Sequence, residues 1–108
     1  MKLIHNFKSP NYNERNSKNV ELVIIHYTAL KSANDSIRYL CSKKTGVSSH
    51  YLISKNGDIN SLVSEKKRAW HAGYSYWDGK KDINSISIGI ELDYLPDKIN
   101  KKYSKKMI

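Results

Sequence analysis

The apolar and polar residues follow two different patterns in the two most regular stretches of the chain. Residues 20–27 form a nearly continuous apolar run, rich in β-branched side chains, that ends at His26 and its neighbour. Such a run is too short for an ordinary helix and predicts a strand buried on both faces. Residues 85–93 instead alternate strictly between large aliphatic residues and serine, glycine or a carboxylate. They predict a strand whose polar face consists of very small residues that lead up to Glu91.

The segment between these strands predicts a helix and a hairpin. Residues 32–43 carry apolar side chains at helical spacing behind a serine or asparagine cap, and Gly46 ends the helix. Residues 47–54 and 59–63 predict two strands joined by a tight Asn-Gly turn. The polar, turn-prone residues 1–19 predict a surface arm that leads into the first strand.

Two further segments complete the predicted order of elements. Residues 69–77 contain four aromatic rings and a histidine and predict a loop with a function. Residues 101–108 predict the first turns of a helix. Together the elements predict an α/β fold, with a mixed central β-sheet and a helix packed on at least one side.

The net charge of the chain predicts a class of binding partner but does not choose among its members. The chain has 108 residues, and its 19 Lys and Arg against 10 Asp and Glu give a net charge of +9. This charge predicts attraction to polyanions such as nucleic acid, anionic lipid or an anionic wall polymer. The lysines concentrate in residues 97–106, which we interpret as a solvated helix face or tail rather than a nucleic-acid arm.

Cysteine usage and hydropathy indicate the compartment. Cys41 is the single cysteine, so an internal disulfide framework is excluded, and we expect it to be a small core residue. The sequence has no apolar stretch of the length of a signal peptide or a membrane span. We therefore expect a cytoplasmic protein, with export by a non-standard route as the alternative.

His26 and Glu91 are the candidate pair for catalysis, because both stand near the carboxyl ends of predicted strands. Zinc hydrolysis needs an imidazole that holds the metal and a carboxylate that takes a proton from water. The alternatives are a hydrogen-bonded histidine at the sheet edge and a solvent-facing glutamate. His71 is a candidate ligand, substrate contact, oxyanion donor or packed loop residue, and His50 reads as structural.

Five segments, spread over nearly the whole chain, resemble the zinc-dependent N-acetylmuramoyl-L-alanine amidases. That family includes AmpD, AmiD, phage T7 lysozyme and the animal peptidoglycan recognition proteins, and the resemblance is closest to the AmpD/AmiD branch. The segments are residues 9–15, 23–28, 47–53, 68–73 and 84–92.

The resemblance implies a fold, a reaction and a set of roles. The fold would be the mixed central sheet flanked by helices of the peptidoglycan-recognition and T7-lysozyme type. The reaction would be zinc-dependent hydrolysis of the amide between N-acetylmuramic acid and L-alanine, in peptidoglycan or in anhydro-muropeptides. His26 would be the first Zn²⁺ ligand and Glu91 the general base. The implied substrate contacts are Trp70, His71, Tyr76 and Trp77.

The sequence departs from this family at its C-terminal end. The family's second and third zinc ligands follow the helix after the Glu91 strand, and this chain ends at Ile108. We therefore expect a single domain over residues 1–108 that lacks its C-terminal helix and last loop and leaves an apolar face open. This predicts self-association or a complementing C-terminal fragment. To complete a zinc site, His50 or His71 would have to replace a missing ligand, although neither matches a ligand position of the family. The alternative function is a muropeptide-binding fragment without catalysis. No nucleic-acid partner is expected.

Overall fold

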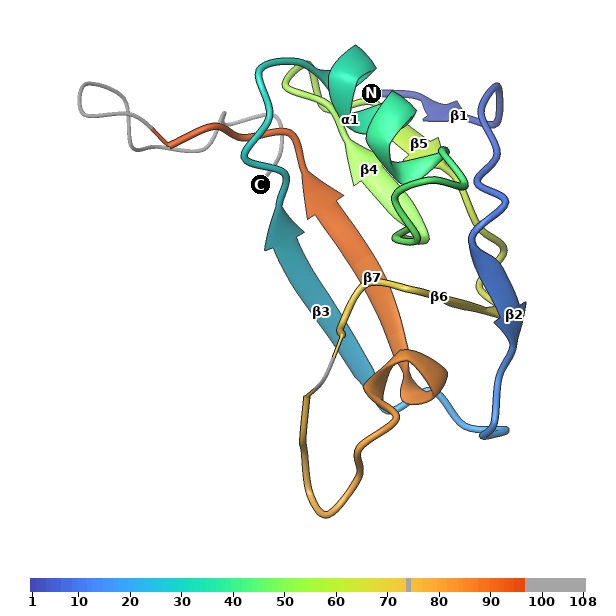
Figure 1. The fold of residues 1–108 in the computed structure, drawn as a ribbon. Coiled ribbons are helices and arrows are strands. Elements are labelled where there is room, and N and C mark those ends of the chain that lie inside the picture. Colours follow the sequence, from blue (N-terminus) through green and yellow to red (C-terminus); the bar gives the residue numbers. More distant parts are fainter. Residues whose placement is uncertain (74, 97–108) are drawn as a thin grey trace.

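The computed structural model describes residues 1–73 and 75–96, and a mixed β-sheet forms its centre. Five strands lie in the order β1, β5, β4, β7 and β3 (Figure 1). Strands β4, β7 and β3 are parallel to one another, whereas β4 and β5 form an antiparallel hairpin. The predicted mixed sheet and hairpin are therefore confirmed. The bounds are Leu3–Ile4 for β1, Leu22–Tyr27 for β3, Tyr51–Ile53 for β4, Ile59–Ser61 for β5 and Ser87–Leu92 for β7.

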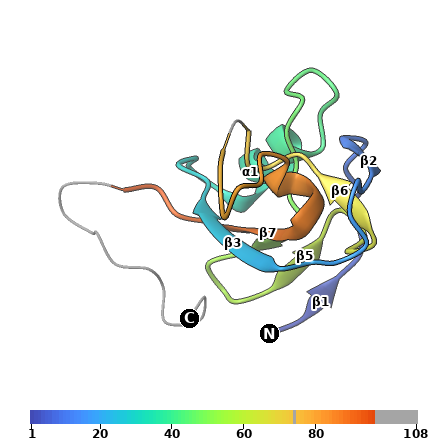
Figure 2. The ribbon, with the colours of Figure 1, turned by 90° about the horizontal axis from the view of Figure 1, so that it is seen from below.

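Helix α1 (Ala33–Leu40) packs on one side of this sheet and confirms the predicted helix, although it ends before residue 43. The Ser32 side chain accepts a hydrogen bond from the backbone N–H of Asp35 at 3.1 Å, which caps the first turn. In the view from below, α1 and β6 lie on the same side of β3 and β7 (Figure 2). The core between α1 and the sheet consists of Ile37 and Leu40 from the helix together with Leu52 and Leu62, and Cys41 and Val47 pack against it.

The predicted surface arm is right in its exposure but not in its lack of structure: residues 1–19 are mostly exposed, yet they contribute two strands and two buried side chains, Ser9 and Asn11. Strand β1 pairs with β5 at one edge of the main sheet. Strand β2 (Tyr12–Glu14) pairs with β6 (Lys67–Ala69) in a second, two-stranded sheet. Asn11 is buried, and its amide donates to two backbone carbonyls of the segment that follows α1, each at 2.8 Å. The polar composition of this mostly exposed segment therefore also includes a side chain that hydrogen-bonds to remote backbone.

The Arg15 side chain links three segments of the chain through hydrogen bonds to backbone carbonyls. Its guanidinium donates to the carbonyl oxygen of Glu65 at 2.8 and 3.1 Å. It also donates to three carbonyls near the start of β7, those of Asn84, Ser85 and Ser87, at 3.0 to 3.1 Å. A 3₁₀ helix, η1 (Ile83–Ile86), occupies this region, so the strand predicted from residue 85 begins only at Ser87.

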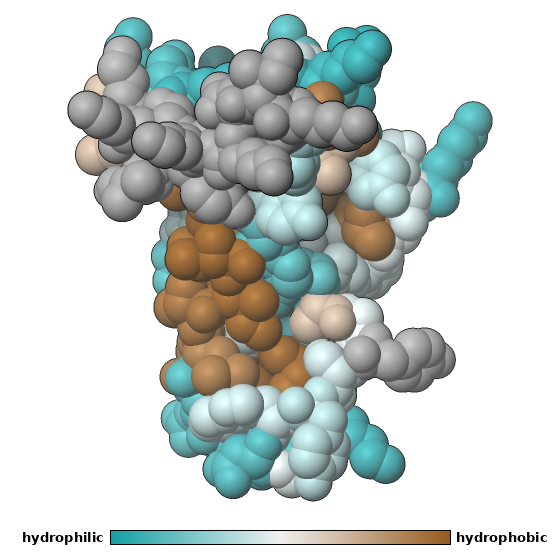
Figure 3. Space-filling view, turned by 90° about the vertical axis from the view of Figure 1, so that its left-hand side faces the viewer, coloured by the Kyte–Doolittle hydropathy of each residue, from teal (hydrophilic) through white to brown (hydrophobic). Residues whose placement is uncertain are grey.

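Strand β3 forms the edge of the sheet, and one of its faces is open to solvent. Val23, Ile25 and Tyr27 are 62%, 63% and 52% exposed, and Figure 3 shows the apolar area on this flank. The prediction that this strand is buried on both faces is wrong, because none of the described residues covers its outer face. An open apolar face agrees with the expectation from the sequence.

Two predictions fall partly or wholly outside this structure. The helix of residues 101–108 and the lysine-rich segment of residues 97–106 lie outside the described residues. Within residues 1–73 and 75–96, no helix has the length and hydropathy that a membrane span requires.

Candidate active site

His26 and Glu91 stand side by side on neighbouring strands. Strand β3 pairs with β7 in parallel, and the register sets His26 opposite Glu91. Residues that face each other across a ladder project to the same side of the sheet. The two side chains of the candidate pair therefore lie on one face of the sheet, on adjacent strands.

His71 lies on the same face of β7, in space that the small residues of that strand leave free. A β carbon at Gly89 would stand 2.5 Å from ring atoms Cγ and Cδ2 of His71. Asn84 holds the backbone of this segment, since its side-chain oxygen accepts the N–H groups of His71 at 3.0 Å and of Ala72 at 2.8 Å. The polar face predicted to hold something on the sheet thus holds this imidazole.

The hydrogen bonds around His71 assign its tautomer. The hydroxyl of Ser87 donates to the carbonyl of Ile83 at 2.7 Å, so its oxygen is the acceptor for His71 Nε2–H at 3.0 Å. Nδ1 of His71 then carries a lone pair. It accepts from Nε2–H of His26 at 3.1 Å, and the two rings meet edge to face.

Both of these imidazoles are neutral near pH 7. Burial, together with the positive charge of neighbouring basic groups, lowers the pKa of His71 to about 3. Burial also lowers the pKa of His26 below its usual 6.5. Neutral imidazole is the form that binds a metal ion.

The carboxyl group of Glu91 is poorly solvated. Its Oε2 is buried and has no hydrogen-bond partner among the described residues. Burial raises the pKa of Glu91 to about 7. A carboxyl group that titrates near neutral pH is suited to accept and return a proton during a reaction.

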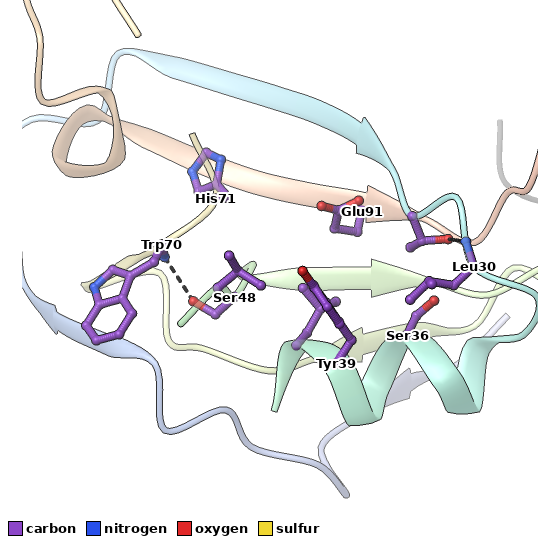
Figure 4. A pocket seen from close by; sticks show the side chains of 10 residues that line it. Leu30, Ser36, Tyr39, Ser48, Trp70, His71 and Glu91 are labelled. Carbon is purple, nitrogen blue, oxygen red and sulfur yellow. Dashed lines mark hydrogen bonds between the residues drawn. The ribbon is translucent and has the colours of Figure 1, made fainter. Parts of the chain in front are cut away.

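A pocket of about 150 Å³ joins Glu91 and His71 to helix α1 (Figure 4). Its wall combines the apolar side chains of Leu30 and Leu40 with the hydroxyl-bearing Tyr39. The other lining residues are Thr28, Ser36, Val47, Ser48 and Trp70. No motif in the sequence distinguished Leu30, Ser36, Tyr39 or Leu40, since these residues come to the pocket only through packing of the helix on the sheet.

Of the aromatic residues predicted to contact a substrate, the structure brings only Trp70 to this pocket. Its backbone N–H donates to the hydroxyl of Ser48 at 2.9 Å, and its indole N–H donates to the Asn13 side chain at 3.0 Å. Tyr76 is 70% exposed and Trp77 is 42% exposed, and neither lines the pocket.

His50 is structural, as the sequence indicated. The residue is fully buried. Its Nδ1 accepts the backbone N–H of Gly89 at 3.0 Å, and its Nε2 bonds to the carbonyl of Lys67 at 2.9 Å. Both ring nitrogens are thus engaged with the backbone that carries the site.

Zinc is the metal that the resemblance implies, and the described residues fit it in part. They contain no group of three or more His, Cys, Asp or Glu side chains arranged to hold a metal ion. His26 and His71 nevertheless offer two imidazole nitrogens 3.1 Å apart, and the orphaned Glu91 oxygen lies on the same face of the sheet. These are donor types that zinc accepts.

Comparison with known proteins gives a consistent picture. The family model of the N-acetylmuramoyl-L-alanine amidases matches residues 16–108. The 1,6-anhydro-N-acetylmuramyl-L-alanine amidase AmpD of Haemophilus influenzae is 33% identical over 104 residues, covering 80% of this chain and 56% of AmpD. The N-acetylmuramoyl-L-alanine amidase AmiD of Escherichia coli is 43% identical over 81 residues, covering 68% of this chain and 28% of AmiD.

Solved structures show the same relationship. A selenomethionine derivative of AmpD superposes with a TM-score of 0.79 at 27% identity, covering 95% of this chain and 66% of that one. AmpDh3 of Pseudomonas aeruginosa, in complex with an anhydromuramic pentapeptide, gives a TM-score of 0.70 at 30% identity, covering 94% and 46%. This chain therefore spans about half of its AmpD relative and less than a third of AmiD.

Proposed function

Because this chain belongs to the N-acetylmuramoyl-L-alanine amidase family, in its AmpD/AmiD branch, we propose that it hydrolyses the amide between N-acetylmuramic acid and L-alanine. The substrate class is the anhydro-muropeptides. AmpD is named for a 1,6-anhydro substrate, and a structure of AmiD holds anhydro-N-acetylmuramic acid-L-Ala-D-γ-Glu-L-Lys. The observation that carries the proposal is the register of His26 with Glu91, beside a pocket that also reaches His71.

The proposed mechanism assigns one role to each of these residues. His26 would hold the Zn²⁺ ion, and that ion would supply Lewis-acid polarisation of the scissile carbonyl. Glu91 takes a proton from the attacking water and returns it to the departing amine of L-alanine. Its desolvated carboxyl, with a pKa of about 7, can do both near neutral pH. No covalent intermediate with the protein is required.

The pocket wall supports this chemistry by excluding water. Leu30 and Leu40 line the same pocket as Glu91, and their apolar side chains reduce the solvation of the groups within it. Trp70 and His71 form the opposite end of the pocket and are the proposed substrate contacts. The contacts predicted for Tyr76 and Trp77 stay a prediction, because both side chains lie outside this pocket.

A second candidate function is binding of muropeptide without hydrolysis. One observation favours it: the described residues supply two imidazole nitrogens, whereas catalytic zinc is normally held by three protein ligands.

Turnover of the AmiD ligand separates the two candidates. The chain would be incubated with Zn²⁺ and anhydro-N-acetylmuramic acid-L-Ala-D-γ-Glu-L-Lys, and free tripeptide measured by liquid chromatography and mass spectrometry. We expect release of tripeptide, lowered about 100-fold or more in Glu91→Gln. Glu14→Gln is the matched control, since Glu14 is an exposed partner of Lys67 on the surface.

The outcomes have distinct meanings. Wild-type turnover by Glu91→Gln would exclude Glu91 as the base. Retention of the wild-type chain on insoluble peptidoglycan, with no tripeptide released at any zinc concentration, would favour the binding function.

A further inference from the structure

The two ring nitrogens that face each other at this site are spaced almost as two ligands of one metal ion. His26 Nε2 and His71 Nδ1 are 3.1 Å apart. Around a tetrahedral ion with metal–nitrogen bonds of about 2.05 Å, two ligand nitrogens stand about 3.3 Å apart. A hydrogen-bonded pair and a ligand pair therefore differ in spacing here by a few tenths of an ångström, and each ring must also turn so that its lone pair points to an ion that lies off the line between the nitrogens.

His71 already has the surroundings of a metal-binding histidine. Such residues usually donate the second ring N–H to a fixed acceptor, which sets the tautomer and aims the other nitrogen. Ser87 is that acceptor, and its own hydroxyl is fixed by its bond to the Ile83 carbonyl. Asn84 holds the backbone, and the absence of a side chain at Gly89 leaves the ring its place.

From these contacts we propose that His71, through Nδ1, and His26, through Nε2, jointly bind one divalent transition-metal ion. The role of His71 is the new element, because its position does not match a zinc ligand of the family pattern that the sequence resembles. The inference rests on the proposed function for the metal at His26. It gives His71 a ligand role in place of a substrate contact.

Binding of the metal ion requires a shift of one proton within His26 but no loss of a proton from the protein. In the metal-free pair, the proton of His26 Nε2 lies between the two nitrogens. When the ion enters, His26 adopts its other neutral tautomer, with the proton on Nδ1, so both facing nitrogens present lone pairs. The remaining coordination positions are open to water or to an oxygen of the substrate. Imidazole donors favour Zn²⁺, Co²⁺, Ni²⁺ or Cu²⁺ over Mg²⁺ or Ca²⁺.

Titration of the whole chain with Zn²⁺, in the absence of substrate, tests this proposal by calorimetry. We expect one ion per chain. His26→Ala and His71→Ala should each weaken binding at least tenfold, and Ser87→Ala about tenfold or more through loss of the second hydrogen bond. His5→Ala is the matched control, because His5 is exposed on a different part of the chain, and its affinity should equal that of the wild type.

A second measurement does not depend on any variant folding. In ¹⁵N spectra of the wild-type imidazoles, Zn²⁺ should shift the resonances of His26 Nε2 and His71 Nδ1 together. Unchanged affinity in folded His71→Ala, or a shift at His26 alone, would overturn the proposal. Absence of zinc binding by the wild type would overturn it as well.

The results also separate this inference from the proposed function. Binding through both histidines without release of tripeptide would sustain the ligand pair and reject hydrolysis. Zinc-dependent hydrolysis with normal affinity in His71→Ala would reject the ligand pair and sustain the amidase.

Discussion

The imidazole ring of His71 fills the space that a side chain at Gly89 would occupy, since a β carbon on the glycine would stand 2.5 Å from two atoms of the ring. The same glycine donates its backbone N–H to His50 at 3.0 Å. One residue without a side chain thus allows a loop histidine to reach the edge strand and meet His26. The placement of His71 at the candidate site therefore requires a residue without a side chain at position 89.

Gly89→Ala should displace the His71 ring and break its bonds to Ser87 and His26. Forcing a methyl group into a filled space typically costs about 1–3 kcal/mol, which urea denaturation would measure. The imidazole resonances of both histidines should move in NMR spectra. Gly46→Ala is the control: Gly46 has a φ of +66° and open space around it, so its substitution adds backbone strain and leaves those resonances in place. Unmoved His71 signals in Gly89→Ala would contradict the placement of the ring.

Glu91→Gln should stabilise the fold at alkaline pH while it removes the proposed base. The pKa of Glu91 is 4.5 in the unfolded chain and about 7 in the fold. Between these values the folded state binds more protons, so the free energy of unfolding of the wild type falls as pH rises from about 4.5 to 7. After allowance for partial exposure of the carboxyl, we expect Glu91→Gln to gain about 1–2 kcal/mol at pH 8.

The comparison at low pH provides the check on that prediction. At pH 4 the Glu91 carboxyl is mainly protonated in both the folded and the unfolded chain. The variant and the wild type should therefore unfold at nearly equal urea concentrations. A gain of the same size at pH 4 and pH 8 would mean that the substitution acts through packing rather than through the charge of Glu91.

Period-2 alternation was sufficient to predict which side chains share a face of the sheet. It identified the polar face that ends at Glu91, because the pleat of a strand fixes these directions locally, whereas it is known only from the structure that the His26 strand lies beside that face. It did not show that β3 is an edge strand, since an apolar run gives no information on what covers it. The burial predicted for Val23 and Ile25 failed for this reason.

The other misses involve bonds between residues far apart in the chain. Asn11 and Arg15 lie in a polar segment that resembles a linker by composition, yet their side chains satisfy remote backbone carbonyls. The position of His71 similarly depends on Asn84 and Gly89, which lie on another element. Such long-range pairs leave no local pattern in a single sequence.

Arg15→Ala should be strongly destabilising. It removes the donors for the exposed backbone carbonyl of Glu65 and for the part-buried carbonyls of residues 84, 85 and 87, and a carbonyl left unsatisfied away from water costs about 1–3 kcal/mol. We expect a loss of about 3 kcal/mol or more in urea denaturation. Arg15→Lys should lose much of the same stability, because an ammonium group cannot reproduce the planar fork of donors.

Arg38→Ala is the matched control for the Arg15 variants. Arg38 forms an exposed ion pair with Asp35 one turn earlier in α1, which is worth roughly 0.5 kcal/mol or less. Equal losses in Arg15→Ala and Arg38→Ala would show that the bonds of Arg15 are replaced by water.

Ile25 and Ile88 allow a test of the open face of β3, because they lie on the same face of neighbouring strands. Ile25 is 63% exposed, whereas Ile88 is 8% exposed. Truncation of a buried isoleucine to alanine costs about 2–5 kcal/mol, and an exposed one much less. We therefore expect Ile88→Ala to lower the free energy of unfolding by at least about 2 kcal/mol, and Ile25→Ala by less than about 1 kcal/mol, in urea denaturation at low protein concentration. A loss in Ile25→Ala as large as that in Ile88→Ala would mean that the outer face of β3 is covered in solution, and the exposed placement of Val23, Ile25 and Tyr27 would be wrong.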